Sequence, residues 1–345
     1  MPDVEHSDLS SGPDEGGAVM LLNQTSRDDS SCDDFEYHPY IVPTLYFLMF
    51  PVSLLLNGVT AWVSLHLEST STFVVYLKNL VVADLIMTLI SPMRVASKLP
   101  QASVRLYALS CRVFSAISYS TLYTCISFLG LIGLDRFCKI MMPHNGLFGR
   151  NLTLSKVVSG SVWLILFGGT ALPNIILSDQ SVANMTEITC MSLKGQAGLE
   201  FHEGTVIFLN VFFWLVSVVI SVCYMCITKK AIQSFQNSGS NNAQGQKKIK
   251  LRVFLVVAVF FVSFAPYHLV RIPYTFHQVS NTEQNSCSYL KGKLAKDLSL
   301  WLANANICMD PLLYVFLCRE FNEKLMSMMK SVSNSLKRLW QAKQK

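Results

Sequence analysis

Seven stretches of the chain are almost continuously apolar, and short polar segments separate them. A helix that crosses the hydrocarbon of a bilayer needs about 20 mostly apolar residues, which is the length of these stretches. The pattern therefore predicts seven membrane-spanning helices, over Tyr40–Leu67, Thr72–Lys98, Leu109–Met141, Thr153–Ser178, Glu203–Phe235, Lys247–His277 and Lys293–Cys318.

The segments outside the spans divide the chain into three parts. Residues 1–39 are acidic and are expected to be disordered, 40–318 form the seven-span domain, and 319–345 form a basic tail. Within the domain, the Gly/Ser/Asn/Gln-rich segment 237–248 is expected to be a flexible loop. In the tail, apolar residues recur at helical spacing from Phe321 to Leu339, which predicts an amphipathic helix on the membrane surface. An unstructured basic tail beyond Lys330 is the alternative.

Composition supports a membrane protein and excludes other classes. Charged residues make up only 14% of the chain, against about 25% in ordinary soluble domains. The net charge of +6 does not indicate a nucleic-acid partner, because the acidic first forty residues and the basic remainder are separated along the chain. No Cys/His cluster has metal-ligand spacing, and no nucleophile–base pair is apparent. We therefore expect no metal, no cofactor and no enzymatic activity.

The positive-inside rule sets the orientation. Lysine and arginine concentrate between the third and fourth spans, between the fifth and sixth, and in the tail. Short loops rich in these residues stay in the cytoplasm. An odd number of spans then places the amino terminus outside the cell and the carboxyl terminus in the cytoplasm, as in a multi-pass protein of the plasma membrane.

Two further sequence features agree with this orientation. Asn23 and Asn184 begin Asn-x-Thr glycosylation signals on the predicted outside, whereas a third signal, at Asn151, falls inside and is taken as chance. Four cysteines also fall outside, where disulfides persist. These are Cys32, Cys111, Cys190 and Cys287, which allow three pairings.

Polar residues inside the spans carry a resemblance to a known family. Asp84 lies in "LVVADLIM", Asp135 and Arg136 end the third span, Pro266 lies in "SFAPYH", and "DPLLY" begins at Asp310. Carboxylates inside a membrane are costly and indicate function. Seven spans with these residues resemble the rhodopsin-like G-protein-coupled receptors, over essentially 40–330.

The resemblance implies a bundle with two states. Asp135 would hold Arg136 until ligand binding releases it and opens a cleft for a heterotrimeric G protein, with arrestin and receptor kinases as further partners. The implied switch residues are Asp84, Asp135, Arg136, Tyr224, Phe264, Pro266, Asn306, Asp310 and Tyr314. The polar cluster of Asp84, Asn306 and Asp310 holds sodium in the family. Here Cys125 replaces a hydroxyl residue, and a thiol is a poor ligand for a hard cation.

Basic and aromatic residues gather at the predicted outer ends of the spans. His268, Arg271, Tyr274 and Gln278 follow one another at helical spacing in the sixth span. Bases at the outer mouth of a bundle predict an anionic ligand, and arginine suits forked contacts with phosphate. Tyr119 and Tyr123 of the third span would stack on a planar base. Lys291, Lys293 and Lys296 lie at the outer end of the seventh span, and Lys291 and Lys293 are expected to be solvated. Lys194, just after Cys190, and His202, at the start of the fifth span, add further basic groups.

Longer stretches resemble one branch of this family, the metabotropic purinoceptors that respond to ADP and UDP-sugars through inhibitory G proteins. They include "FVVYLKNLVVADLIMTL", "FLGLIGLDRFCKI", "VFFVSFAPYHLVRIPYTFHQ" and "NICMDPLLYVFLC", and the stretches "ALPNIILSDQSV" and "YHLVRIPYT" lean towards the UDP-glucose receptor. The ligand set implied by position is Tyr119, Tyr123, Lys194, His202, His268, Arg271, Tyr274, Gln278 and Lys296. The implied disulfides are Cys111–Cys190 and Cys32–Cys287.

Two alternatives stay open. A receptor of the same class could bind another anion, such as a lysophospholipid or a leukotriene. A transporter is the second alternative, although the chain has no detectable internal repeats and no matched pair of glycine-broken helices.

Overall fold

The structure is a computed structural model, and it describes residues 39–343 apart from 69, 143–150, 183–188, 238–242 and 280–286. The acidic amino-terminal segment, both outer glycosylation signals and Cys32 lie outside the described residues.

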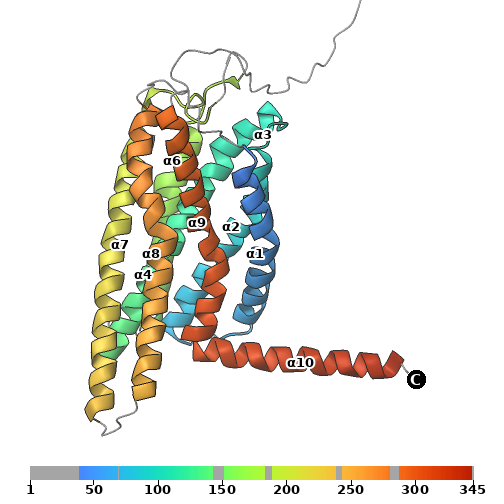
Figure 1. Cartoon of the computed structure of the whole chain (residues 1–345), viewed down its shortest axis with the longest axis vertical. Coiled ribbons are helices and arrows are strands. Elements are labelled where there is room, and N and C mark those ends of the chain that lie inside the picture. Colours follow the sequence, from blue (N-terminus) through green and yellow to red (C-terminus); the bar gives the residue numbers. More distant parts are fainter. Residues whose placement is uncertain are drawn as a thin grey trace, which may run out of the picture.

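Long helices run side by side and form a bundle (Figure 1). They are α1 (Ile41–Leu65), α2 (Thr72–Ala96), α3 (Val104–Leu109) continuing through η1 (Ser110–Phe114) into α4 (Ser115–Met141), α5 (Leu152–Trp163) continuing through η2 (Leu164–Ala171) into α6 (Leu172–Ile176), α7 (Gln196–Asn237), α8 (Ala243–Val279) and α9 (Cys287–Leu317). The predicted all-α bundle is confirmed. Within the part of the chain that the structure describes, six helices are long and apolar enough to cross a membrane, and α9 meets the same test as a seventh when it is taken together with α10 (Arg319–Lys343).

Several helices extend beyond the apolar stretches that predict them. The third spanning helix begins at Val104 rather than Leu109, the fifth at Gln196 rather than Glu203, and the seventh at Cys287 rather than Lys293. The segment 243–248, predicted as loop, is the first part of α8. Hydrophobicity marks the part of a helix that lies in lipid, whereas backbone hydrogen bonding continues into water wherever the residues are compatible with a helix.

α4 lies at the centre of the bundle and packs against α2, α5 and α7. Its approach to α7 is close, because a Cβ added to Gly130 would lie 2.8 Å from Cγ1 of Val216. Large apolar side chains on the outer faces of the helices are exposed, among them Phe47, Leu215 and Leu269. In a bilayer these side chains would meet lipid rather than water.

α10 turns away from α9 by 94° and runs out from one end of the bundle (Figure 1). Cys318 and Phe321 are buried at the turn, so the start of α10 is fixed to the bundle. The helix continues to Lys343, and the alternative of an unstructured tail beyond Lys330 is therefore wrong for 331–343. We call this end of the bundle the α10 end.

At the opposite end, a disulfide joins Cys111 of η1 to Cys190 in the segment before α7. We call this end the disulfide end. Both η1 and η2 are short π-helical segments inside longer helices, and such wider turns often occur at functional sites.

Candidate ligand-binding site

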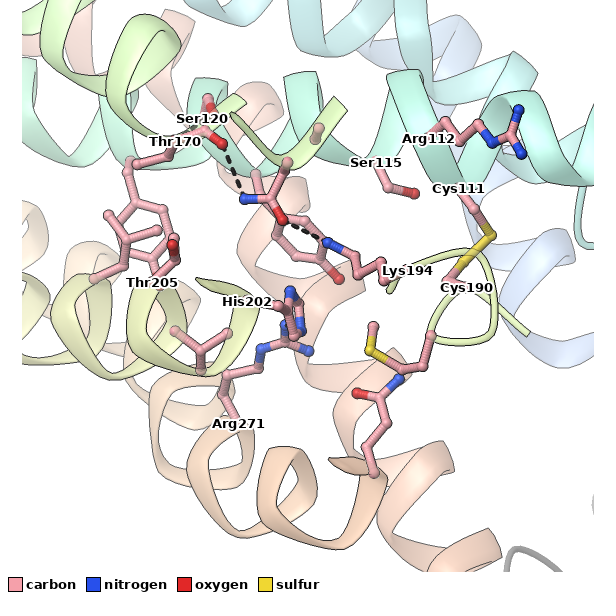
Figure 2. A pocket seen from close by; sticks show the side chains of 18 of the residues that line it. Cys111, Arg112, Ser115, Ser120, Thr170, Cys190, Lys194, His202, Thr205 and Arg271 are labelled. Carbon is pink, nitrogen blue, oxygen red and sulfur yellow. Dashed lines mark hydrogen bonds between the residues drawn. A yellow bond between two sulfur atoms is a disulfide. The ribbon is translucent and has the colours of Figure 1, made fainter. Parts of the chain in front are cut away.

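A cavity of about 130 Å³ lies between the helices at the disulfide end. Residues from η1, α4, η2, α6, α7, α8 and α9 line it, together with the segment around Cys190 and Lys194. Figure 2 shows the side chains of Lys194, His202 and Arg271 directed towards one another across this space. Convergence of polar groups in a pocket of this kind is the usual mark of a ligand site.

Arg271 of α8 is the most deeply buried cation of the cavity, with 5% of its surface exposed. Its guanidinium lies 3.3 Å from Nε2 of His202 and 5.3 Å from the ring centre of Tyr119. Among the described residues, no carboxylate oxygen lies within ion-pair distance of it. A buried charge without a counter-ion costs several kcal/mol, roughly, and an anionic ligand would remove that cost.

Lys194 reaches the cavity from the segment that the disulfide holds against η1. Its Nζ donates a hydrogen bond of 2.6 Å to Oδ1 of Asn174, whose amide donates in turn to the carbonyl of Thr170 at 2.9 Å (Figure 2). Burial, and to a lesser degree the nearby charge of Arg271, lowers the pKa of Lys194 to about 8. The ammonium is therefore held in place but is easier to deprotonate than an ordinary lysine.

Lys296 of α9 lines the cavity but already has an acidic partner. Its Nζ lies 2.8 Å from Oδ1 of Asp297, and the same oxygen is 3.3 Å from Nζ of Lys98. The Lys296 ammonium also lies 4.9 Å from the ring centre of Tyr274.

The cavity brings together most of the ligand set implied by the sequence. The members that line it are Tyr119, Tyr123, Lys194, His202, Arg271, Gln278 and Lys296. Oε1 of Gln278 is buried and has no hydrogen-bond partner among the described residues, which leaves an acceptor for a donor group of a ligand.

His268 and Tyr274 do not line the cavity. Nδ1 of His268 donates to the carbonyl of Phe264 at 2.8 Å, and Nε2 accepts from the hydroxyl of Tyr123 at 3.1 Å. The His268 ring also stacks on Phe213 at 3.7 Å. Both ring nitrogens are thus used inside the bundle, and His268 supports the position of Tyr123 rather than offering an atom to the cavity.

Several polar residues of the cavity are absent from the set implied by the sequence. They are Arg112, Ser115, Ser120, Thr170, Asn174, Thr205 and Tyr267. Arg112 directly follows Cys111, and Asn174 directly follows Pro173. These neighbouring positions were the sequence features that could have indicated that Arg112 and Asn174 line the cavity. Serine and threonine give no such signal, because in apolar helices they commonly bond to their own backbone.

At the α10 end, Asp135 has two partners that the sequence does not suggest. Thr72 donates to its Oδ1 at 2.5 Å, and Nζ of Lys139 lies 2.8 Å from its Oδ2. The Arg136 guanidinium lies over the ring of Phe73, 4.8 Å from its centre. The resemblance implies that Asp135 holds Arg136. The structure adds that the Asp135 carboxylate contacts Lys139 and ties α4 to the first residue of α2.

A polar cluster lies midway along the bundle. Asp84 accepts from the hydroxyl of Tyr314 at 2.9 Å and from the thiol of Cys125 at 3.6 Å, and the amide of Asn306 donates to Asp310 at 2.8 Å. Because one of the groups on Asp84 is a thiol, the cluster fits a sodium ion poorly.

The remaining switch residues surround a smaller cavity of about 30 Å³ towards the α10 end. Tyr224, Asn306 and Tyr314 line it. Phe260 of α8 also lines this cavity, and Phe264, one helical turn after it, is fully buried. Pro266 lies inside the same helix. A helix that contains proline lacks one backbone hydrogen bond and bends there more readily.

Comparison with known proteins relates the chain to membrane receptors. The sequence profile of the 7 transmembrane receptor (rhodopsin family) matches residues 57–314. P2Y purinoceptor 13 of Homo sapiens is 43% identical over 309 residues, 89% of this chain and 86% of that protein. P2Y purinoceptor 14 of Bos taurus is 38% identical over 83% of this chain and 84% of its own length. G-protein coupled receptor 87 of Mus musculus is 35% identical over 84% of this chain and 80% of its own length.

Proposed function

Because the chain belongs to the rhodopsin family of seven-transmembrane receptors, and within it to the P2Y purinoceptor branch, we propose that it is a cell-surface receptor for an extracellular nucleotide or nucleotide-sugar. The chain is a multi-pass protein of the plasma membrane and a receptor rather than an enzyme. The observation that carries the ligand class is the cavity itself, in which Arg271 is buried with no acidic partner among the described residues.

The lining of the cavity supports a phosphate-bearing ligand over a lipid. Arg271, Lys194 and Lys296 are among the cationic side chains that line the cavity, and arginine offers the forked donor geometry that phosphate oxygens accept. Tyr119 and Tyr267 lie stacked at 6.5 Å, and stacking on such a ring contributes about 1–3 kcal/mol per base. A lysophospholipid or leukotriene would instead require a long apolar channel.

The direction of the chain in the membrane follows from charge. We propose that the disulfide end faces the outside and the α10 end faces the cytoplasm, since basic residues concentrate near the ends of α4 and α7, at the start of α8 and along α10. Glycans on Asn23 and Asn184, and a second disulfide between Cys32 and Cys287, would then lie outside the cell.

Signalling is proposed to run through an inhibitory heterotrimeric G protein, with arrestin and receptor kinases acting afterwards. Ligand binding would shift the bundle between two states by its different affinity for them. The contacts of Asp135 with Thr72 and of Arg136 with Phe73 support a role for both residues in this shift, because they join α4 to α2.

The choice between nucleotides and nucleotide-sugars is open. The chain is 43% identical to one P2Y purinoceptor 13 and 38% identical to one P2Y purinoceptor 14, so identity alone does not favour the UDP-glucose receptor towards which short stretches lean.

A cyclic-AMP assay in transfected cells tests the proposal. ADP, UDP-glucose and related nucleotides are applied to cells that express the receptor, with and without pertussis toxin. We expect at least one of them to lower cyclic AMP and the toxin to abolish the effect. No response to any member of the panel, with surface expression verified, would reject the nucleotide assignment; a response that survives the toxin would reject the inhibitory G protein.

The lowered pKa of Lys194 predicts that agonist binding depends on pH. Lys194 binds an anion only when protonated, so affinity should be constant below its pKa of about 8 and fall as the pH rises through it. Between pH 7 and pH 9 we expect a loss of about tenfold in radioligand affinity. Lys194→Arg keeps its charge over this range and serves as the control. An equal loss in this variant would assign the pH dependence to another group.

A further inference from the structure

Asp297 is the one buried carboxylate of the disulfide end in the part of the chain that the structure describes. The other buried aspartates of the described residues lie in the middle of the bundle or at the α10 end; they are Asp84, Asp135 and Asp310. Only 5% of the surface of Asp297 is exposed, although it lies among several cations. A buried carboxylate lowers the stability of the fold unless cations match its charge. The groups that contact Asp297 therefore have to be identified.

The partners of Asp297 come from α9 and from the turn that follows α2. Its Oδ1 lies 2.8 Å from Nζ of Lys296, the preceding residue of α9, and 3.3 Å from Nζ of Lys98, just beyond the end of α2. Lys296 lines the ligand cavity, whereas Lys98 does not. The side chain of Lys98 is 36% exposed and that of Lys296 is 13% exposed, so water competes for the first contact more than for the second.

This arrangement divides the cavity cations into two kinds. Arg271 contacts His202 and aromatic rings and has no carboxylate within ion-pair distance among the described residues. Lys296, by contrast, is paired with Asp297. A phosphate that approaches Lys296 therefore meets a second anion already bound to the same ammonium. The two negative groups repel each other when they share one cation.

We propose that Asp297 is an internal counter-ion that competes with an anionic ligand for Lys296, and that Lys98 receives Asp297 when Lys296 turns to the ligand. This inference rests on the proposed function, because it assumes an anionic agonist in the cavity. Asp297 thereby sets how strongly the site favours ligands of higher negative charge, although it touches no ligand itself. Its link to Lys98 also ties the ends of α2 and α9 together in both states.

Removal of the Asp297 charge and removal of the Lys98 charge are expected to change nucleotide affinity in opposite directions. Asp297→Asn keeps the shape and removes the charge, so Lys296 becomes fully available, and nucleotide affinity should rise about tenfold. The gain should be larger for a nucleoside triphosphate than for a nucleotide-sugar. Lys98→Gln removes the alternative partner, so Asp297 stays on Lys296 and affinity should fall about threefold. In the double variant, affinity should match that of Asp297→Asn alone, because Lys98 acts only through Asp297.

Radioligand competition on membranes measures these shifts, with Asp179→Asn as the matched control. Asp179 is an exposed acid near the same end of the bundle, and its loss changes the overall charge equally. Unchanged or weaker binding in Asp297→Asn would overturn the proposal, and so would equal gains in Asp297→Asn and Asp179→Asn. If Asp297→Asn fails to reach the membrane, the fall expected for Lys98→Gln still tests the proposal, and its absence overturns it.

A ligand-independent measurement separates this inference from the proposed function. Purified ligand-free receptor is melted with and without inorganic pyrophosphate. Asp297→Asn leaves two close cations unmatched, so it should melt at a lower temperature than wild type, and pyrophosphate should restore more stability to it than to wild type. An unchanged melting temperature overturns the counter-ion role whether or not any nucleotide binds. If Asp297→Asn melts at a lower temperature and no nucleotide binds the receptor, the counter-ion role of Asp297 is upheld and only the proposed ligand class is rejected.

Discussion

Arg271→Ala is expected to reduce nucleotide affinity and agonist potency by at least about a hundredfold, because truncating one partner of a buried charge pair costs about 2–5 kcal/mol. Arg271 is the most deeply buried cation of the cavity and has no acidic partner among the described residues. It contacts His202 of α7 and the ring of Tyr119 of α4. An anionic ligand would therefore gain more from Arg271 than from Lys296, whose charge Asp297 already matches.

Two further variants make this prediction specific. Arg105→Ala removes an exposed arginine at the same end and should change potency little. Arg271→Lys keeps the charge but loses the forked donor geometry, so an intermediate loss is expected. Concentration–response curves for cyclic AMP, with surface expression measured in parallel, provide the data. Equal potency in wild type and Arg271→Ala would show that the ligand's anion binds elsewhere.

Gly130→Ala is expected to destabilise the helix bundle, with a loss of about 1–3 kcal/mol in stability. The added methyl group would lie 2.8 Å from Cγ1 of Val216, so either Val216 must change its rotamer or α4 and α7 must move apart. These two helices carry Tyr119, Tyr123 and His202, and we expect the variant to lose ligand affinity as well as stability. Thermal melting of the purified receptor measures the first effect and radioligand binding the second.

The cause can be tested by a compensating change. Val216→Ala removes the clashing atom, so the double variant should recover most of the stability that Gly130→Ala loses. Gly58→Ala is the matched control, because a Cβ there meets no atom within 4 Å and alanine favours the helix. A double variant no more stable than Gly130→Ala would locate the strain elsewhere.

The sequence predicts the fold well because a membrane restricts the possibilities. Apolar stretches of spanning length must become helices or closed barrels, and loop charges then set their direction. What hydrophobicity misses is the helix that continues in water, as at Val104 and Gln196, and the π-helical turns of η1 and η2. These turns depend on how neighbouring helices pack and leave no mark in composition.

The candidate site is predicted less completely. Arg271 and Lys296 are identified because charges in apolar surroundings are rarely accidental. His268 lies on the same helix at similar spacing, yet its ring turns into the bundle, where Phe213, Phe264 and Tyr123 engage it. Periodicity places a residue on a helix face but does not choose its rotamer or its partners.

The contacts of Asp297 are a second feature of the site that the sequence does not predict. Asp297 follows Lys296 in the sequence and looks there like one more charge near a helix end. Only the structure shows that Lys98, in the turn after α2, reaches the same carboxylate oxygen. Contacts between residues far apart in the chain are the part that spacing cannot supply.

The most direct test of the central claim is a cryo-electron-microscopy structure of the receptor with its agonist nucleotide bound. We predict phosphate oxygens within hydrogen-bond distance of the Arg271 guanidinium and of the ammonium groups of Lys194 or Lys296, with the base against Tyr119. Phosphates that lie outside this cavity, away from all three cations, would contradict the account.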